Sequence, residues 1–274
     1  MYIISGLSAV FIYVICAELF SMPWDSSEPL PRELEKTNSN VLIGKWRKGK
    51  LFHNFNKHAH MLVAGHTGYG KTNFIKTLLP QLNGEIILID LKGGFDYDFV
   101  TASEIHEAEN VLSEVVANMR QRRKQHIYVI VDEAYEIVVP KWATTKSEKE
   151  PYLKCQQYVS EIARLGRTFK VHLIYCTQYP TREVLDGQIK QNMESRIILR
   201  LPTDIASRVA LDEEGAEELP AGVPGRGIYK KDYKIEMQCY EYTDRERGDE
   251  VVKIRTSENT RNRDTIEIGE VEHS

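Results

Sequence analysis

The stretch Gly65-His66-Thr67-Gly68-Tyr69-Gly70-Lys71-Thr72 decides the fold of this chain. An apolar run at residues 61–64 precedes it, and a helical pattern that ends at Pro80 follows it. Glycines let successive backbone N–H groups point at phosphate oxygens, and a helix start adds partial positive charge. Lys71 would reach the β- and γ-phosphates, and the Thr72 hydroxyl would ligate Mg²⁺. The stretch predicts a nucleoside triphosphate site, against the alternative of an ordinary glycine-rich turn.

Strand-like and helix-like patterns alternate through the rest of the chain. Strands are expected at residues 61–64, 86–90, 127–131, 172–177 and 196–201, and helices at residues 72–79, 104–123, 152–167 and 205–210. Such alternation is typical of an α/β fold with a mostly parallel sheet and helices on both faces. Ligands of such folds bind at the carboxyl ends of the strands.

Composition sets the limits of the functional interpretation. The chain has 274 residues, 42% of them hydrophobic, which is enough for one sizeable α/β core. The formal charge of −4 is carried by residues 241–274, which hold 10 acidic and 6 basic residues. The rest is neutral, so any surface that binds nucleic acid must be local. The four scattered cysteines fit a reducing compartment and give no indication of zinc.

The ends of the chain differ from its middle. Residues 1–17 carry no charge, and a helix extended to Phe20 would span about 30 Å, the thickness of a hydrocarbon core. The nearest basic residues, Arg32 and Lys36, follow this segment. The positive-inside rule then places the bulk of the chain in the cytoplasm. We expect a single-pass cell-membrane helix at 1–20, a proline-containing linker at 21–40, a motor domain at 41–240 and a mobile tail at 241–274. A buried element of the globular domain is the alternative for 1–20.

Two carboxylates follow an apolar strand pattern at residues 127–131. A phosphate-loop enzyme needs a carboxylate in the Mg²⁺ shell, and we assign this role to Asp132. Its neighbour Glu133 can polarise the attacking water and is the candidate general base. Capping of a following helix is the alternative for this pair. Asp90 also ends an apolar run, lacks an acidic neighbour and ranks second for the metal.

The ordered motifs downstream resemble those of the FtsK/SpoIIIE family of DNA-translocating ATPases. The resemblance runs from about Val41 to Lys230 and includes Asp132-Glu133, Ile162-Ala163-Arg164-Leu165-Gly166-Arg167, Cys176-Thr177-Gln178-Tyr179-Pro180, Gln188-Ile189-Lys190-Gln191-Asn192, Ser207-Arg208, Leu211-Asp212, Gly215-Ala216-Glu217 and Gly225-Arg226-Gly227. A phosphate loop alone would not bring this series in this order. The resemblance implies a RecA-like P-loop core, a homo-hexamer with ATP and Mg²⁺ between neighbouring subunits, and double-stranded DNA in a central pore.

The resemblance also implies roles for single residues. Gln178 would face the γ-phosphate if its strand lies between the strands of the phosphate loop and of Asp132. Arg167 is the candidate arginine finger that reaches a neighbour's ATP, with a cation at a helix end as the alternative. Arg182 and Lys190 fall in a pore loop and would contact DNA phosphates, unless they are solvated surface charges.

The layout narrows the function further. At most one membrane span and a short polar tail make the chain similar to compact motors of conjugative elements, in which the ATPase couples DNA to a transfer channel. We therefore expect a membrane-anchored, DNA-stimulated translocase with a channel or relaxase-type partner. The main alternative is a nucleotide-dependent membrane scaffold that recruits DNA-processing partners without moving DNA. A small-molecule phosphotransferase is disfavoured by Glu133 and by the lack of an arginine-rich lid.

Overall fold

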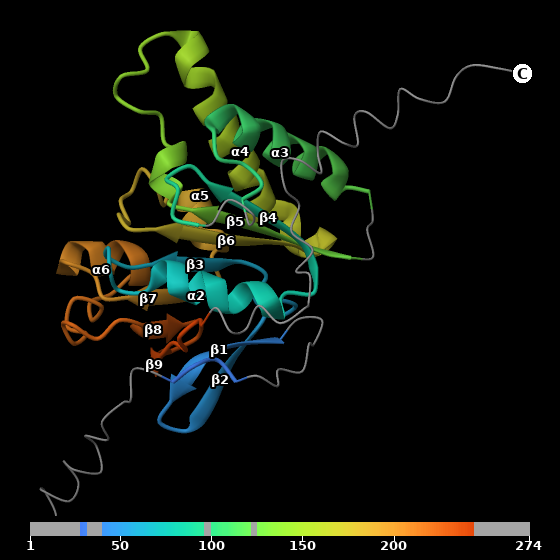
Figure 1. Ribbon diagram of the computed structural model, residues 1–274. Helices are drawn as coiled ribbons and strands as arrows, with labels where there is room; N and C mark the ends of the chain where they lie inside the picture. The colour runs from blue at the N-terminus through green and yellow to red at the C-terminus, as the bar shows by residue number, and fades with distance from the viewer. Residues whose placement is uncertain (1–27, 32–39, 96–99, 122–124, 244–274) are drawn as a thin grey trace, which may run out of the picture.

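The computed structural model describes residues 28–31, 40–95, 100–121 and 125–243 (Figure 1). The predicted membrane segment at 1–20, most of the predicted linker and the tail from residue 244 onward lie outside these ranges. Within the described ranges, no helix combines the length and the apolar character needed to cross a membrane.

The regular elements run from Asn40 to Gln238. The strands are β1 (Asn40–Trp46), β2 (Gly49–Asn54), β3 (Met61–Ala64), β4 (Gly84–Asp90), β5 (His126–Asp132), β6 (Val171–Thr177), β7 (Ser195–Leu199), β8 (Arg226–Lys230) and β9 (Lys234–Gln238). The α-helices are α2 (Lys71–Leu78), α3 (Ile105–Met119), α4 (Lys146–Phe169), α5 (Gly187–Asn192) and α6 (Asp204–Leu211), and the short 3-10 helices are η1 (Leu79–Gln81) and η3 (Ala134–Ile137).

All of these strands belong to one mixed sheet with the order β2-β1-β9-β8-β7-β3-β6-β5-β4. The half from β7 to β4 is parallel, whereas β8, β9, β1 and β2 each pair antiparallel with their neighbours. The five predicted strands are parallel, as expected, but the sheet as a whole is mixed rather than mostly parallel. Short turns at residues 47–48 and 231–233 join β1 to β2 and β8 to β9, and such short connections can only join antiparallel strands.

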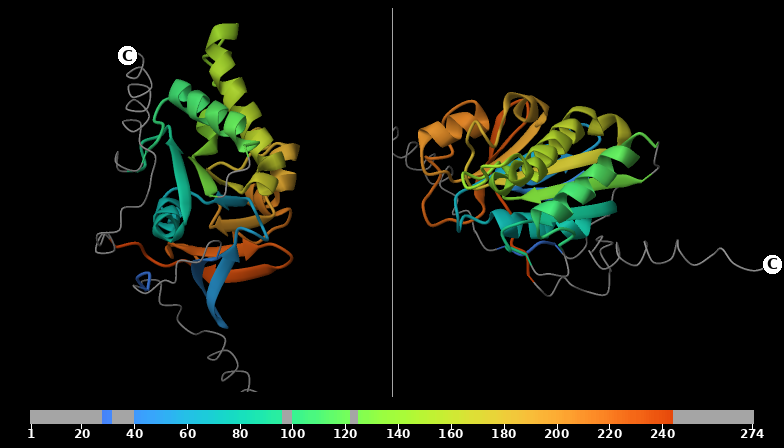
Figure 2. Two further views of the ribbon diagram at one scale, coloured as in Figure 1. Left: turned by 90° about the vertical axis from the view of Figure 1, so that its right-hand side faces the viewer. Right: turned by 90° about the horizontal axis from the view of Figure 1, so that it is seen from above.

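Two hydrophobic layers enclose the sheet, as the alternation of side chains along each strand requires. Leu62 and Val129 belong to the layer formed with α3 and α4, whereas Val63 and Ile130 belong to the layer that contains α2. Helices α3 and α4 lie on one side of the sheet and α2 on the other (Figures 1 and 2). All four side chains are buried, and each such burial stabilises the fold by about 1.5–3 kcal/mol. The predicted helices on both faces are confirmed. The ends of the parallel strands are thereby held at one edge.

Helix α4 begins earlier than predicted. Thr145 Oγ1 accepts a hydrogen bond from the Glu148 N–H, and the Glu148 carboxylate accepts one from the Thr145 N–H. This capping box fixes the first turn at Lys146. The predicted start at residue 152 was wrong. Proline is disfavoured inside helices, so a helix was expected to begin after Pro151, whereas Pro151 lies within α4.

Buried histidines form an unusual polar cluster within the core. His126 Nδ1 lies 2.7 Å from His172 Nε2, and His53 Nδ1 lies 3.0 Å from the Tyr229 hydroxyl oxygen. Burial lowers the pKa of His53 and His172 to about 3 and that of His60 to about 4. Among the described residues, the Nε2 atoms of His53 and His60 have no hydrogen-bond partner. The fold therefore holds these rings in their neutral form.

Acidification from about pH 7 to about pH 5 is expected to lower the free energy of unfolding. Histidines of the unfolded chain take up protons near their ordinary pKa of about 6.5, whereas the buried rings stay neutral until about pH 3–4. The contribution of these histidines to the free energy of unfolding is therefore fully present above pH 6.5. Below pH 6.5 it falls by about 1.4 kcal/mol per pH unit for each histidine. Urea denaturation measures the slope. His53→Phe should flatten it relative to exposed His106→Gln, and equal slopes for these two variants would contradict the assignment.

Candidate functional site

The predicted phosphate loop joins the end of β3 to the first turn of α2. Gly70 precedes the helix with φ of 94°, a left-handed conformation that favours glycine. A side-chain carbon on Gly65 would lie 2.7 Å from Leu199 Cβ, so only glycine fits there. No side chain caps the first turn of α2, which leaves its N–H groups available to an anion. The loop has the geometry that a phosphate cradle requires.

Backbone hydrogen bonds hold this loop to three neighbouring segments. Gly65 N donates to Thr177 O at 3.2 Å, and His66 N donates to Arg200 O at 2.9 Å. On the other side, the Gly225 N–H donates to Tyr69 O at 2.9 Å. The structure brings all of the predicted phosphate-loop residues together in this segment, namely Gly65, His66, Thr67, Gly68, Tyr69, Gly70, Lys71 and Thr72.

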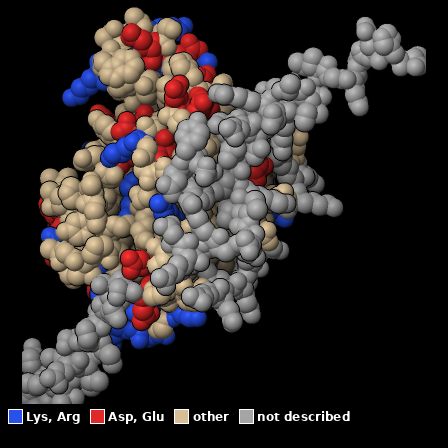
Figure 3. Space-filling model, viewed as in Figure 1, with Lys and Arg blue, Asp and Glu red and all other residues tan. Residues whose placement is uncertain are grey.

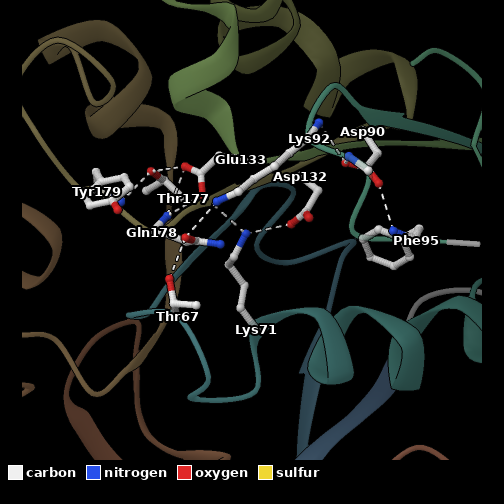
Figure 4. Close-up of polar contacts among 11 residues, drawn as sticks. Thr67, Lys71, Asp90, Lys92, Phe95, Asp132, Glu133, Thr177, Gln178 and Tyr179 are labelled. Carbon is white, nitrogen blue, oxygen red and sulfur yellow. Dashed lines mark hydrogen bonds and ion pairs between the residues drawn. The ribbon is translucent and has the colours of Figure 1, made fainter. Parts of the chain in front are cut away.

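Lys71 reaches the acidic pair at the end of β5 (Figure 4). Its Nζ lies 2.8 Å from Asp132 Oδ1 and 3.7 Å from Glu133 Oε2, and all three side chains are almost fully buried. Burial alone would lower the pKa of Lys71, but the Asp132 carboxylate, together with Cys176 and Glu133, raises it above its ordinary value. Lys71 is therefore a buried ammonium that a phosphate oxygen could take over from Asp132.

Oxygen atoms of three side chains converge on Gly94. A side-chain carbon placed there would lie 3.4 Å from Asp132 Oδ2 and 4.0 Å from both Asp90 Oδ2 and Thr72 Oγ1. Burial raises the pKa of Asp132, Lys71 opposes this, and the nearby carboxylates raise it further. A divalent cation would relieve this excess of negative charge, and Mg²⁺ prefers oxygen ligands. Residues Thr72 and Asp132 therefore fit the predicted metal role.

Asp90 has a different task in this structure. Its Oδ1 accepts hydrogen bonds from Lys92 N at 3.1 Å and Gly93 N at 2.9 Å, and its Oδ2 accepts one from Phe95 N at 2.9 Å. Three backbone donors on one buried carboxylate fix the path of the segment that follows β4. These contacts support Asp132 ahead of Asp90 as the metal ligand. In the described ranges, no group of three or more acidic, His or Cys residues could hold a metal without the phosphates.

Glu133 is held by the end of the neighbouring strand β6. Its Oε1 accepts from Thr177 Oγ1 at 3.0 Å, and the Gln178 N–H lies 3.1 Å from Oε1 and 3.0 Å from Oε2. Glu133 has φ of 61°, a conformation that costs about 1–3 kcal/mol outside glycine and is common at functional sites. The capping alternative fails, because η3, which follows, has no side-chain cap. The carboxylate is oriented beside Lys71 instead.

Gln178 connects three segments of the site. Strand β6 lies between β3 and β5, the arrangement on which the predicted role of Gln178 depends. Its Oε1 accepts hydrogen bonds from Thr67 Oγ1 of the phosphate loop at 2.8 Å and from Lys92 Nζ at 2.9 Å (Figure 4). Thr177 and Lys92 were not predicted as site residues. The position of Thr177 before Gln178 at a strand end was the available signal, whereas Lys92 had only its closeness to Asp90.

The remaining predicted residues lie away from this cluster. Arg167 is exposed in the last turn of α4, and its Nη1 pairs with Glu194 Oε1 at 2.7 Å. Lys190 in α5 pairs with Asp212 at 2.5 Å, and Arg182 is exposed between β6 and α5. None of the three contacts the phosphate loop of its own chain. Their predicted roles concern a neighbouring subunit and DNA, and they stay predictions.

Known proteins share this architecture. Residues 54–205 match the protein family described as the central domain of helicase HerA. The chain belongs to this HerA/FtsK-type family of P-loop ATPases. The FtsK-like assignment made from the motifs is thereby confirmed.

Relatives of this ATPase include the DNA translocase FtsK of Listeria monocytogenes, 26% identical over 226 residues that cover 69% of this chain and 30% of that protein. FtsK of Campylobacter jejuni is 28% identical over 67% of this chain and 23% of that protein. The chain thus spans less than a third of these curated relatives.

Solved structures show the same fold. The pCW3 conjugation coupling protein TcpA, in a monomer form with ATPγS, has a TM-score of 0.75 and 26% identity over 80% of this chain and 71% of that one. The Type VII secretion ATPase EccC of Thermomonospora curvata has a TM-score of 0.59 at 20% identity, covering 79% of this chain and 30% of that one. This second likeness concerns the fold alone.

Replacing Thr177 by Val is expected to lower kcat for ATP hydrolysis by about tenfold or more, with little effect on ATP affinity. The variant keeps the shape of the side chain but removes the hydroxyl that orients Glu133, and a hydrogen bond to a charged group contributes about 1.5–3 kcal/mol. Steady-state ATPase kinetics measure both parameters. Thr177→Ser keeps the hydroxyl and should stay near wild type. A normal kcat in Thr177→Val would show that Thr177 does not position the carboxylate.

Proposed function

We propose that this chain is the motor of a membrane-anchored, homo-hexameric translocase that uses Mg²⁺-dependent ATP hydrolysis to move double-stranded DNA. One observation carries the proposal. The buried carboxylate of Glu133 lies beside Lys71 of the phosphate loop and is oriented by Thr177 and Gln178. A carboxylate placed in this way can prime a water for attack on a terminal phosphate.

Each residue of the site has a part in this hydrolysis. Glu133 accepts the proton of the water whose oxygen attacks the γ-phosphorus, and the bond between this phosphorus and the β–γ bridging oxygen breaks. Lys71 moves from Asp132 to the phosphate oxygens and balances their charge. Thr72 and Asp132 would hold Mg²⁺, which would neutralise charge on the phosphates when bound. Gln178 lies between Thr67 and Lys92, where the γ-phosphate would bind.

Double-stranded DNA is the proposed substrate because two relatives are DNA translocases by name. On the described part of the face in Figure 3, basic and acidic side chains are interspersed, so a local surface has to bind the DNA. The exposed Arg182 is the stronger candidate for a phosphate contact. Lys190 would first have to leave Asp212.

A role in DNA transfer is supported by the likeness to TcpA, a conjugation coupling protein, over most of both chains. A coupling motor needs a position at the membrane, which the apolar segment at residues 1–20 would provide as an anchor with the ATPase domain in the cytoplasm. A transfer-channel or relaxase-type protein would then be its partner.

The full chain is expected to hydrolyse ATP several-fold faster with double-stranded DNA at low salt than without it. Lys71→Ala should abolish turnover and weaken ATP binding because the phosphates lose their buried cation. Glu133→Gln should abolish turnover but keep ATP bound. Phosphate release measures hydrolysis, and a fluorescent nucleotide measures binding. Turnover that is indifferent to DNA would contradict the translocase and favour the nucleotide-dependent scaffold.

When Arg167→Ala subunits are mixed into wild type, DNA-stimulated turnover is expected to fall more steeply than the fraction of wild-type subunits. Arg167 is exposed and contacts no part of its own phosphate loop, so a finger role requires a neighbour's ATP. Arg120→Ala, which removes an exposed cation of another surface ion pair, is the matched control. A linear decline with the fraction of Arg167→Ala would show that this arginine does not act in trans.

A further inference from the structure

Lys92 is a second lysine at the phosphate site, on the side opposite the phosphate loop. It lies in the segment that follows β4, whose backbone is fixed by three hydrogen bonds to the buried Asp90 carboxylate. The side chain extends across the site, above Lys71 and toward Gln178 (Figure 4). Unlike Lys71, Lys92 is exposed, so a ligand can reach its ammonium group without unfolding the segment.

The ammonium of Lys92 is held by a neutral acceptor. Its Nζ donates to Gln178 Oε1 at 2.9 Å, and this oxygen also accepts from Thr67 Oγ1 at 2.8 Å. Among the described residues, no carboxylate forms an ion pair with Lys92. A hydrogen bond from an ammonium to a phosphate oxygen is roughly twice as strong as one between neutral groups. A phosphate oxygen is therefore a better partner for Lys92 than the amide that now holds it.

The position of this ammonium selects one phosphate. Through the shared oxygen of Gln178, Lys92 is connected to Thr67, the third residue of the phosphate loop. Glu133, the proposed base, accepts the backbone N–H of the same Gln178. Lys92 thus lies on the same side of the site as Glu133, which would prime the attacking water. The terminal phosphate of a triphosphate has to lie on that side as well.

We propose that Lys92 binds the γ-phosphate directly and makes the site prefer a nucleoside triphosphate over a diphosphate. On ATP binding, the Lys92 ammonium exchanges Gln178 Oε1 for a γ-phosphate oxygen, and the released amide of Gln178 is free to turn. Loss of this phosphate after hydrolysis returns Lys92 to Gln178. The proposal rests on the proposed ATP hydrolysis and adds a triphosphate-sensing cation to it.

The test compares ATPγS and ADP binding to the full chain and to Lys92→Met. The variant is expected to bind ATPγS about tenfold more weakly, which corresponds to about 1.4 kcal/mol, and ADP within about twofold of wild type. Lys92→Arg should restore most of the preference. Lys50→Met, which removes an exposed lysine of β2, is the matched control and should change neither affinity. Displacement of a fluorescent nucleotide gives each Kd, and thermal melting confirms that each variant is folded.

Two results would overturn the proposal. Equal losses for ATPγS and ADP, or no loss for either, would show that Lys92 does not contact the terminal phosphate. If Lys92 acts only by positioning Gln178, Lys92→Met should have no further effect in a Gln178→Leu background, whereas direct contact predicts that its effect persists there. Failure of wild type to bind ATPγS would instead contradict the proposed function itself, so the two failures are distinguishable.

Discussion

The buried charges at the carboxyl ends of β4 and β5 are the constraint on which the site depends. Asp90, Asp132 and Glu133 are almost fully buried, and the buried ammonium of Lys71 pairs with Asp132 and Glu133. Burial of an ion costs several kcal/mol unless partners compensate it. Asp90 is compensated by backbone N–H groups and Glu133 by Thr177 and Gln178, so Asp132 and Lys71 depend mainly on each other. We expect this pair to separate when a phosphate oxygen replaces Asp132 beside Lys71 and a cation replaces Lys71 beside Asp132.

The sheet order explains how such a cluster can form. Parallel strands bring their carboxyl ends to one edge, and β3, β6, β5 and β4 are neighbours there. Strand β6 contributes Thr177 and Gln178 between the phosphate loop and the acidic pair. A phosphate bound at this point would therefore lie beside residues of β6 and of the segment after β4.

Much of the parallel half of the sheet could be predicted from the sequence, because each strand and motif there is indicated by residues that are adjacent in the chain. Strand β3 was predicted within its observed bounds, and the acidic pair follows an apolar run. The antiparallel half was missed because polar residues and glycines interrupt its strands, as in the alternating burial of β9. Lys92 could not be predicted because its partner Gln178 lies 86 residues away in the chain and meets it only in the folded sheet.

A crystal structure with Mg²⁺ and ATPγS would show whether Lys71 leaves Asp132 when nucleotide binds. We expect the Lys71 ammonium at the phosphates, Asp132 facing the metal, and Glu133 within reach of a water beside the terminal phosphorus. A nucleotide bound elsewhere, with Lys71 still paired to Asp132 and Glu133 remote from the terminal phosphorus, would contradict this expectation.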